Sequence, residues 1–366
     1  MKIKIGDITK IRTGKLDANA ADENGQYPFF TCSKEPLKIN TYSYDCECVL
    51  VAGNGDLNVK YYNGKFDAYQ RTYIIEDDSD GLLFMPYLYF FMESYIDELR
   101  KQSIGGVIKY IKLKNLTDAL IELPSIEVQR KIVNIISKSK EIVRRKENEF
   151  ELLDELVRAR FVEMFGDPVD NPMNWKKKKL KDIVTEDCTI SYGIVQTGEE
   201  QKEGVPVFRP VDIVNHTPKV EELKKTTEFI SDRYKKTLLK GHELLITVRA
   251  NIADTFIADE EFMGCNVGRG IVPIRTQEDI MRLEFLKCLI DNKHLNDILK
   301  SKAKGITLIQ LNMEDLRNVE LIIPPIDLQI DYLKYSRLID KSRSRIQKSL
   351  EASQELFDSL MQEYFG

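Results

Sequence analysis

The sequence predicts a mixed α/β protein made of two similar modules, each a twisted and mostly antiparallel sheet with helices. Two long helices would join the modules and form an antiparallel coiled coil with pseudo-twofold symmetry. Three observations support this. The chain has 366 residues, which fits two domains better than one. One stretch of sequence returns 200 positions later, and each copy ends in a long segment without proline or glycine.

The repeat is clearest where Leu123–Gln129 matches Ile323–Gln329, with Pro124 and Pro324 at equivalent positions. It continues without a gap to Phe165–Gly166 and Phe365–Gly366, which close the two copies. Proline favours the first turn of a helix and glycine favours its end. The predicted segments are 1–123 for the first module, 124–166 for the first helix, 167–323 for the second module and 324–366 for the second helix.

The beginnings of the modules match more loosely, but in the same order. The matching pairs are Ile11–Gly14 with Ile190–Gly193, Gly25–Phe30 with Gly204–Arg209, and Glu47–Val51 with Glu243–Thr247. Short alternating apolar segments, interrupted by Gly, Pro and Asn, predict strands in both modules. Amphipathic spacing predicts one helix in each module, over residues 86–100 and 279–300. The chain is therefore a tandem duplication of a module followed by a helix.

Apolar residues recur at heptad-like spacing in both long helices, which is the pattern of a coiled-coil seam. The predicted seam consists of Ile136, Val143, Phe150 and Val157 in the first helix and Ile339, Ile346, Leu350 and Phe357 in the second. Ile135, Ile142, Leu153 and Leu156 would widen it. A helix of about 39 residues rises about 58 Å, and alone it would leave its apolar stripe in water. We expect the two helices to pair with each other; packing on their own modules or on another subunit is the alternative.

This order of elements resembles the specificity subunits of Type I restriction-modification systems (the HsdS family) over essentially the whole chain. The residues that carry the resemblance are Leu123–Gln129 and Ile323–Gln329, each before a long helix, together with Ile190–Gly193 and Gly305–Thr307. The second helix departs from the first at Asp331 and Ser336, where the first has Lys131 and Ile136.

The resemblance implies that each module is a target-recognition domain that reads one half of a bipartite DNA sequence, while the helices set the unread gap. It also implies two modification subunits, which carry the methyltransferase site and bind S-adenosylmethionine, and motor-nuclease restriction subunits that join this complex. This chain would be the non-catalytic DNA-recognition subunit and would need no cofactor of its own.

Long polar side chains on module loops are the candidates for reading bases, because Arg pairs with guanine and Asn or Gln pairs with adenine. In the first module we predict that Arg12, Asn54, Lys60, Gln70, Arg71, Lys101, Ser103 and Lys109 bind DNA. In the second module the candidates are Tyr192, Gln196, Arg209, Arg249, Asn251, Arg269, Lys302, Lys304 and Thr307. A lysine run at 176–179 is better explained as a solvated face of the linker.

The net charge of −5 works against a DNA-binding function, since phosphate binding needs local positive potential. Affinity must then come from a local basic face or from a partner. No apolar run reaches the ~18 residues that span a bilayer, and the first residues lack a secretory signal, so we expect no membrane contact and a cytoplasmic location. The six cysteines show no CxxC spacing, which favours buried thiols over a metal site or disulfides.

Two other function classes remain open. A coiled-coil scaffold that binds only protein is compatible with the acidic charge. A metal-dependent nuclease is weakly suggested by Asp212 followed by Glu222 and Lys224, a pattern that arises easily by chance when 31% of residues are charged. No phosphate-binding GxxxxGK[ST] motif and no Asn-Pro-Pro-Tyr/Phe methyltransferase motif is present.

Overall fold

The computed structural model describes residues 2–214, 218–305 and 309–366, and the chain divides into two compact units. Unit 1 consists of residues 1–150 and 345–366, and unit 2 of residues 151–344. Each unit contains one module and parts of both long helices. The predicted boundaries between modules and helices stay a prediction.

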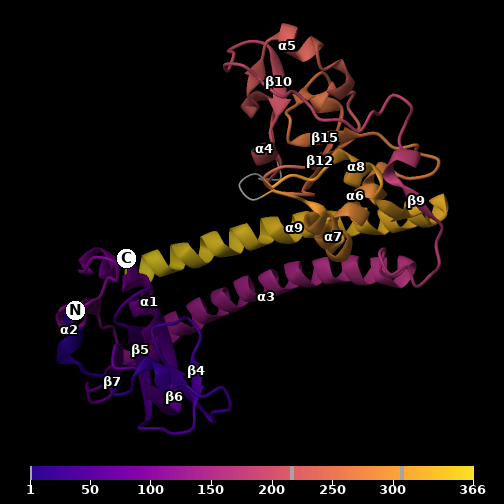
Figure 1. Ribbon diagram of the computed structural model, residues 1–366. Helices are drawn as coiled ribbons and strands as arrows, with labels where there is room; N and C mark the ends of the chain where they lie inside the picture. Colours follow the sequence, from indigo (N-terminus) through magenta and orange to yellow (C-terminus); the bar gives the residue numbers. More distant parts are fainter. Residues whose placement is uncertain (1, 215–217, 306–308) are drawn as a thin grey trace. The chain divides into compact units, whose positions relative to one another are not determined.

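The module of unit 1 is built on a six-stranded sheet of order β2-β7-β5-β6-β3-β4, beside a two-stranded sheet of β1 and β8 (Figure 1). The strands are β1 Lys2–Lys4, β2 Thr9–Thr13, β3 Tyr27–Phe30, β4 Leu37–Ile39, β5 Tyr44–Ala52, β6 Val59–Ala68, β7 Thr72–Asp77 and β8 Leu120–Glu122; the helices are α1 Met85–Gln102 and α2 Leu113–Thr117. All strand pairs are antiparallel except β3 with β6. Helix α1 confirms the helix predicted over residues 86–100.

Strand β5 lies inside this sheet, and its second half, residues 48–52, is buried on both faces, which explains the apolar run there. Val49 and Val51 point toward α1 and join the core that it covers. Cys48 and Leu50 point to the opposite face and join a second, smaller core. Successive side chains on a strand alternate between faces, so one strand supplies both cores.

The module of unit 2 repeats this plan with shorter strands. Its strands are β9 Lys177–Lys179, β10 Val205–Phe208, β11 Lys225–Thr226, β12 Glu243–Thr247, β13 Thr255–Ala258, β14 Asn266–Val267, β15 Ile271–Ile274 and β16 Glu320–Ile322; its helices are α4 Pro210–Val214, α5 Glu228–Asp232, α6 Leu283–Asp291, α7 Lys293–Lys302 and α8 Met313–Arg317. The sheets have the orders β13-β12-β15, β11-β10-β14 and β16-β9. Strand β9 contains most of the lysine run, and its side chains are exposed, as expected for a solvated face.

Strand register corrects the sequence match between the modules. Val49 pairs with Ile75, and Leu244 pairs with Ile274, so Val49 corresponds to Leu244 and not to Leu245. The match of Glu47–Val51 with Glu243–Thr247 was therefore wrong by one residue. A slip of one residue moves every side chain to the other face of the sheet. An all-apolar strand gives no alternation from which the sequence could reveal the slip.

The helix predicted over residues 279–300 was also wrong, because the structure has two helices there. Asn292 ends α6 and caps α7: its side-chain oxygen accepts hydrogen bonds from the backbone N–H groups of His294 at 3.0 Å and Leu295 at 3.4 Å. Asn is a favoured N-cap residue because it satisfies amide groups that a helix start leaves unpaired. The break allows both α6 and α7 to pack into the core of unit 2.

The two long helices, α3 and α9, run from Ile126 to Phe165 and from Ile326 to Phe365, 40 residues each (Figure 1). They start two residues after the predicted prolines and end at the predicted glycines. Gly166 has a φ of +71°, and a Cβ at this position would lie 2.5 Å from Pro172 Cγ. Glycine is the residue that adopts this left-handed conformation without steric cost, so it terminates α3 sharply.

The predicted seam lies on the inner side of the helices. Ile136 and Val143 are buried, and Phe150, Val157 and the four seam residues of α9 are partly buried. The proposed widening was wrong for Ile135, Ile142 and Leu156, which are exposed. A helix that packs on one neighbouring helix buries a narrow stripe, which these three residues flank.

Segments of α3 and α9 pack antiparallel inside each unit. In unit 2, Phe161 contacts Tyr332 at 5.5 Å between ring centroids, and Arg160 lies over the ring of Tyr335. Asp154 pairs with Arg343 further along. Along these contacts the residue numbers increase on α9 while they decrease on α3, so the two segments are antiparallel. In unit 1, the α3 residues Ile132 and Ile136 share a core with residues from the end of α9, including Phe357.

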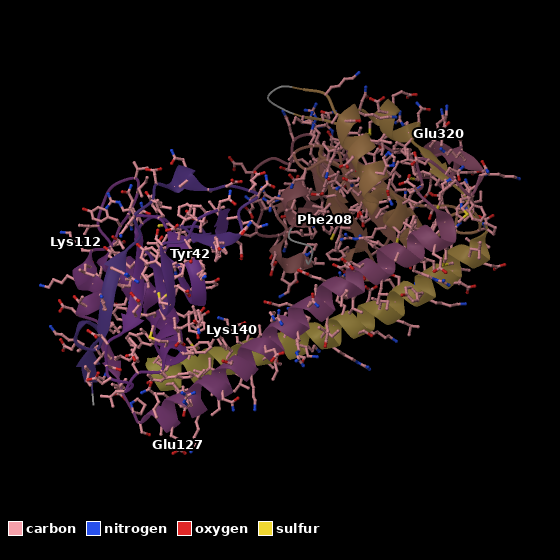
Figure 2. All side chains as sticks on the ribbon, turned by 90° about the horizontal axis from the view of Figure 1, so that it is seen from below. Tyr42, Lys112, Glu127, Lys140, Phe208 and Glu320 are labelled. Atoms are coloured by element: carbon pink, nitrogen blue, oxygen red, sulfur yellow. The ribbon has the colours of Figure 1, made fainter. Side chains whose placement is uncertain are left out.

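Unit 1 is also joined to α3 by polar contacts. Lys140, labelled in Figure 2, donates hydrogen bonds from Nζ to Glu93 at 2.8 Å and to the Tyr89 hydroxyl at 2.8 Å, both on α1. Burial and the adjacent Glu93 carboxylate raise the pKa of Tyr89 well above its usual value, which keeps the hydroxyl protonated. Helix α3 is thereby held against the module that precedes it.

All six cysteines are free thiols. Cys48, Cys188 and Cys265 are buried, and burial raises the pKa of Cys265 to about 11 and that of Cys288 to about 12. Within the described ranges, no helix combines the length and hydropathy needed to cross a membrane.

Candidate nucleic-acid interface

Most predicted DNA-binding residues of unit 1 gather where strand β5 ends. Asn54 follows β5, and its two neighbours are hydrogen-bonded to other predicted segments: Gly53 N–H donates to Arg71 O at 2.8 Å, and Gly55 N–H donates to Lys109 O at 3.0 Å. Asn54 therefore sits between the Gln70–Arg71 turn and the loop that contains Lys109. Three segments far apart in the sequence meet at one end of the sheet.

The loop Ile104–Tyr110 is closed by two reciprocal backbone hydrogen bonds, Ile104 N–H to Tyr110 O at 3.0 Å and Tyr110 N–H to Ile104 O at 2.9 Å. Ser103 precedes it, and its hydroxyl donates to Arg100 O. Lys101 forms the last turn of α1 and pairs with Glu98. This loop thus adds Lys101, Ser103 and Lys109 to the same region.

Lys60 and Arg12 are held by partners within the module. Lys60 Nζ donates to Ser33 O at 2.7 Å and also to Asn58, and burial lowers the pKa of its ammonium group. Arg12 Nε pairs with Glu76 at 2.8 Å, and its guanidinium lies over the Tyr44 ring. These two side chains are less available to a ligand than the exposed Gln70, Arg71 and Lys109.

In unit 2 the equivalent region centres on Gln310, which sequence reasoning missed. Arg249 Nε donates to Gln310 Oε1 at 2.7 Å, and Gln310 Nε2 donates to the Tyr192 hydroxyl. Gln310 and Lys304 close a loop with two backbone hydrogen bonds of 3.0 Å, as Tyr110 and Ile104 do in unit 1. The offset of 200 that relates the long helices also relates Tyr110 to Gln310, and this signal could have identified both residues.

Backbone hydrogen bonds made by their sequence neighbours place Arg269 and Arg209 near this cluster. Val248 N–H, next to Arg249, donates to Gly270 O at 2.8 Å, and Gly268 N–H donates to Phe208 O at 2.8 Å. Arg269 is exposed between these two glycines. Arg209 makes two side-chain hydrogen bonds to Asp212, which raise the pKa of its guanidinium. Of the two, Arg269 is the one available to a ligand.

The remaining predicted residues of unit 2 are less closely tied to Gln310. Asn251 lies in a tight loop after β12, where Ala250 has a φ of +59°, and its side chain is exposed. Gln196 and Lys302 are exposed, and Lys302 ends α7 as Gln102 ends α1. Thr307 lies outside the described residues.

Close backbone contacts show that the two clusters are equivalent. A Cβ on Gly14 would lie 2.1 Å from Ala68 O, and a Cβ on Gly193 would lie 1.9 Å from Val267 O. Ala68 pairs in parallel with Phe30, and Val267 pairs in parallel with Phe208. Only glycine permits this approach, so the match of Ile11–Gly14 with Ile190–Gly193 is confirmed as a shared structural feature.

The acidic residues that suggested a nuclease do not converge. Asp212 is engaged by Arg209, Lys224 pairs with Glu200 at 2.8 Å, and Glu222 faces Lys219 at 3.9 Å. Each makes a separate local ion pair.

Among the described residues, one group has metal-ligating spacing: Asp167, Asp170 and His294, whose ligand atoms lie within 4.8 Å of one another. Asp167 already accepts hydrogen bonds from Val169 N–H, Asp170 N–H and His294. These bonds lower the pKa of Asp167 despite its partial burial. The group therefore serves as a cap for the turn after α3.

Comparisons with known proteins show which family the chain resembles in sequence. A family model described as "Type I restriction modification DNA specificity domain" matches residues 1–152 and 172–352. The chain is 45% identical over 123 residues to the Type I restriction enzyme EcoDI specificity subunit of Escherichia coli, covering 34% of this chain and 27% of that protein. It is 21% identical over 312 residues to the EcoBI specificity subunit of the same species, covering 79% of this chain and 65% of that protein. The chain thus spans less than two thirds of each of these relatives.

Solved structures share the fold. The chain matches the S subunit of a Type I restriction-modification system from M. genitalium with a TM-score of 0.63 and 14% identity, covering 100% of this chain and 96% of that one. A chain from a study of complex assembly in a type I R-M system matches with a TM-score of 0.61 and 16% identity, covering 100% and 97%.

Proposed function

Because the chain belongs to the family of Type I restriction modification DNA specificity domains, we propose that it recognises a bipartite DNA site for such a system. Each module reads one half-site, and the two long helices set the gap between the halves and dock the methyltransferase subunits. The observation that carries this proposal is the duplicated cluster, in which Asn54 and Arg249 occupy equivalent places at the ends of β5 and β12.

The chemistry of the clusters suits base reading. Exposed Arg, Lys, Gln and Asn side chains offer the donors and acceptors that distinguish bases in the grooves, while lysines and backbone N–H groups position phosphates. Their scaffold is rigid, because both clusters are fastened by backbone hydrogen bonds between separate segments. Rigid placement lowers the entropic cost of binding.

The partners follow from the same role. We propose double-stranded DNA, two modification subunits that bind S-adenosylmethionine, and motor-nuclease restriction subunits that join through that complex. This chain adds recognition and no catalysis. Its net charge of −5 is consistent with tight binding only in the complex, where partner subunits add positive surface.

Co-expression with the modification genes that accompany it, followed by genome-wide methylation mapping, tests the proposal. We expect methylation within a split motif. Exchanging residues 1–123 for the corresponding module of a relative should change one half-site, and exchanging residues 167–323 should change the other.

Two results would contradict this reading. Absence of methylation together with absence of DNA retention by the purified complex would favour a protein-binding scaffold. Metal-dependent cleavage of DNA by the isolated chain, abolished by Glu222→Ala, would establish the nuclease alternative. Glu221→Ala is the matched control for that variant, because Glu221 is the exposed neighbour on the same short turn.

A further inference from the structure

The loop Ile104–Tyr110 of unit 1 exposes more apolar surface than its own module requires. Val107 is fully exposed at 104%, Ile108 is 63% exposed and Ile104 is 44% exposed. None of these side chains contributes to the cores of unit 1. Consecutive exposed β-branched side chains are unfavourable in water, and burial against a partner would remove this cost.

The shape of this loop is set before any partner binds. The reciprocal hydrogen bonds between Ile104 and Tyr110 close its base, and the bond from Gly55 N–H to Lys109 O fastens its side. Gly105 has a φ of +122°, and a Cβ there would lie 2.5 Å from Ile108 O. Because the backbone of the loop is already ordered, binding of a partner at the tip carries a smaller loss of conformational entropy.

Lysines flank the apolar tip in the sequence. Lys101, Lys109 and Lys112 are exposed, and Lys112 lies at the periphery of unit 1 in Figure 2. Within the described part of the chain, Lys109 and Lys112 form no ion pair, whereas Lys101 pairs with Glu98 at 3.4 Å. An apolar tip flanked by the uncompensated charges of Lys109 and Lys112 is complementary to a polyanion with an apolar interior. Duplex DNA has this character, since its stacked bases lie between two rows of phosphates.

The corresponding loop of unit 2 is closed in the same way. In unit 2 the loop closed by Lys304 and Gln310 has the same pair of backbone hydrogen bonds, and Ile309 at its end is 50% exposed. Lys302 and Lys304 flank it and are exposed. Residues 306–308 lie outside the described residues. The two modules thus share the closed loop, while the offset of 200 places Ile309 opposite Lys109 and not opposite the apolar tip.

We propose that Val107 and Ile108 form an apolar wedge that enters the base stack of duplex DNA from the minor groove, while Lys109 and Lys112 bind the adjacent phosphates. This inference rests on the proposed function and adds a mode of contact to it. Apolar wedges of this kind unstack one base step and bend the duplex by about 20–90°. The module would then select sites that tolerate such a bend, in addition to reading base edges.

The test uses the full chain in complex with its modification subunits and a duplex that contains the mapped site. 2-Aminopurine is placed at successive steps of the half-site assigned to residues 1–123. We expect its fluorescence to rise at one step when the parent complex binds. Val107→Ser combined with Ile108→Ser should abolish this rise and weaken binding about tenfold.

Leu82→Ser is the matched control. Leu82 is 61% exposed and lies at the opposite end of α1, an 18-residue helix that rises about 27 Å. It should leave both fluorescence and affinity unchanged. The thermal midpoint of the double variant should stay within about 2 °C of the parent, because exposed substitutions rarely change stability.

The outcomes separate the wedge from the proposed function. If the parent complex methylates a split site and the double variant keeps full fluorescence and affinity, the wedge is wrong and the reading function stands. If the double variant instead loses its modification subunits, the loop is a protein contact and the wedge is again wrong. If the parent complex neither binds nor methylates a split site, the proposed function has failed, and the wedge fails with it.

Discussion

Gln129 and Gln329 show at the scale of single residues how the repeat is built into the fold. The side chain of Gln129 is buried; it accepts a hydrogen bond from Phe84 N–H at 2.8 Å and donates to Leu82 O at 2.8 Å and Pro124 O at 2.9 Å. Gln329 makes the same three bonds with Arg282, Ile280 and Pro324 at 2.9–3.0 Å. Each amide joins the start of a long helix to the start of a module helix.

Replacing either glutamine by alanine should therefore destabilise its own unit. Gln129→Ala leaves one donor and two acceptors in part-buried hydrogen bonds without their partner and opens a cavity at the buried Gln129 side chain, at a cost of about 2–4 kcal/mol. Urea unfolding measures the loss, and hydrogen exchange should locate it around Phe84 in the first variant and Arg282 in the second. Gln26→Ala, at an exposed position of unit 1, is the control. Equal unfolding midpoints for Gln129→Ala and the control would contradict this role.

Asp187 gives unit 2 an acid-sensitive contact. Hydrogen bonds from Lys240 and Thr185, followed by the nearby Arg275 and Lys240 charges, hold the pKa of Asp187 well below its usual value. A carboxyl whose pKa is lowered by folding stabilises the folded state above its unfolded pKa near 4. That contribution is lost as pH falls through this value toward the folded pKa.

Asp187→Asn should consequently lower stability at pH 7, while the difference from the parent should shrink as pH falls below about 4. Because the side chain is 48% exposed, solvent screening limits the loss to about 1 kcal/mol or less. Thermal unfolding at pH 7, 5 and 3 measures it. Asp232→Asn, at an exposed ion pair elsewhere in unit 2, is a suitable comparison. A difference that grows as pH falls would reverse the expected sign.

At the scale of elements, each long helix starts on one module and ends on the other. Phe165, at the end of α3, contacts Phe285 on α6 with ring centroids 4.8 Å apart. Phe365, at the end of α9, contacts Tyr87 on α1 with centroids 5.0 Å apart. Tyr87 and Phe285 occupy equivalent places near the starts of their helices. The segments between these ends are those for which we propose a spacing role.

Inserting seven residues into both helices, after Phe150 in α3 and after Ser344 in α9, should lengthen the unread gap without changing either half-site. These positions coincide with the division between the units, so the pairings inside each unit are kept. One heptad preserves the seam and adds about 10 Å of rise, or about three base pairs. Methylation mapping measures the new gap.

An insertion in α3 alone is the control for this experiment. It would misalign the seam with α9 and should lower stability or abolish methylation without producing a longer gap. A double insertion that changed the half-sites themselves would show that readers and spacers are not separate.

At the scale of the whole chain, the repeat predicted the architecture well. Both long helices, their closing glycines, α1 and the mostly antiparallel sheets follow from local patterns. The failures occurred where local patterns lack information. The apolar periodicity continues across Asn292 and therefore hides the helix break there. The apolar run of β12 shows no alternation, so it does not reveal the register. Whether Ile135 and Ile142 are exposed depends on how much of the apolar stripe of α3 a neighbouring element covers, and the sequence of α3 does not show this.

The candidate interface was predicted in its composition but not in its arrangement. Nearly all the predicted residues of unit 1 belong to segments that meet at the end of β5, yet the sequence could not show that Asn54 lies between Arg71 and Lys109. Nor could it show that Arg12 and Lys60 are occupied by internal partners. Gln310 was missed because the offset of 200, which relates it to Tyr110, was not followed into this loop.

By itself, the sequence of this protein determined the duplicated plan, the two long helices and the residue types available for contact with DNA, because periodicity and helix-stop signals act over a few residues. Only the tertiary structure decided which side chains remain free, since the partners of Arg12, Lys60 and the buried Gln129 lie on segments distant in the chain. The exposed tip at Val107 and Ile108 is of this second kind. These two side chains are apolar, and only the folded cores, which do not contain them, show that they remain exposed.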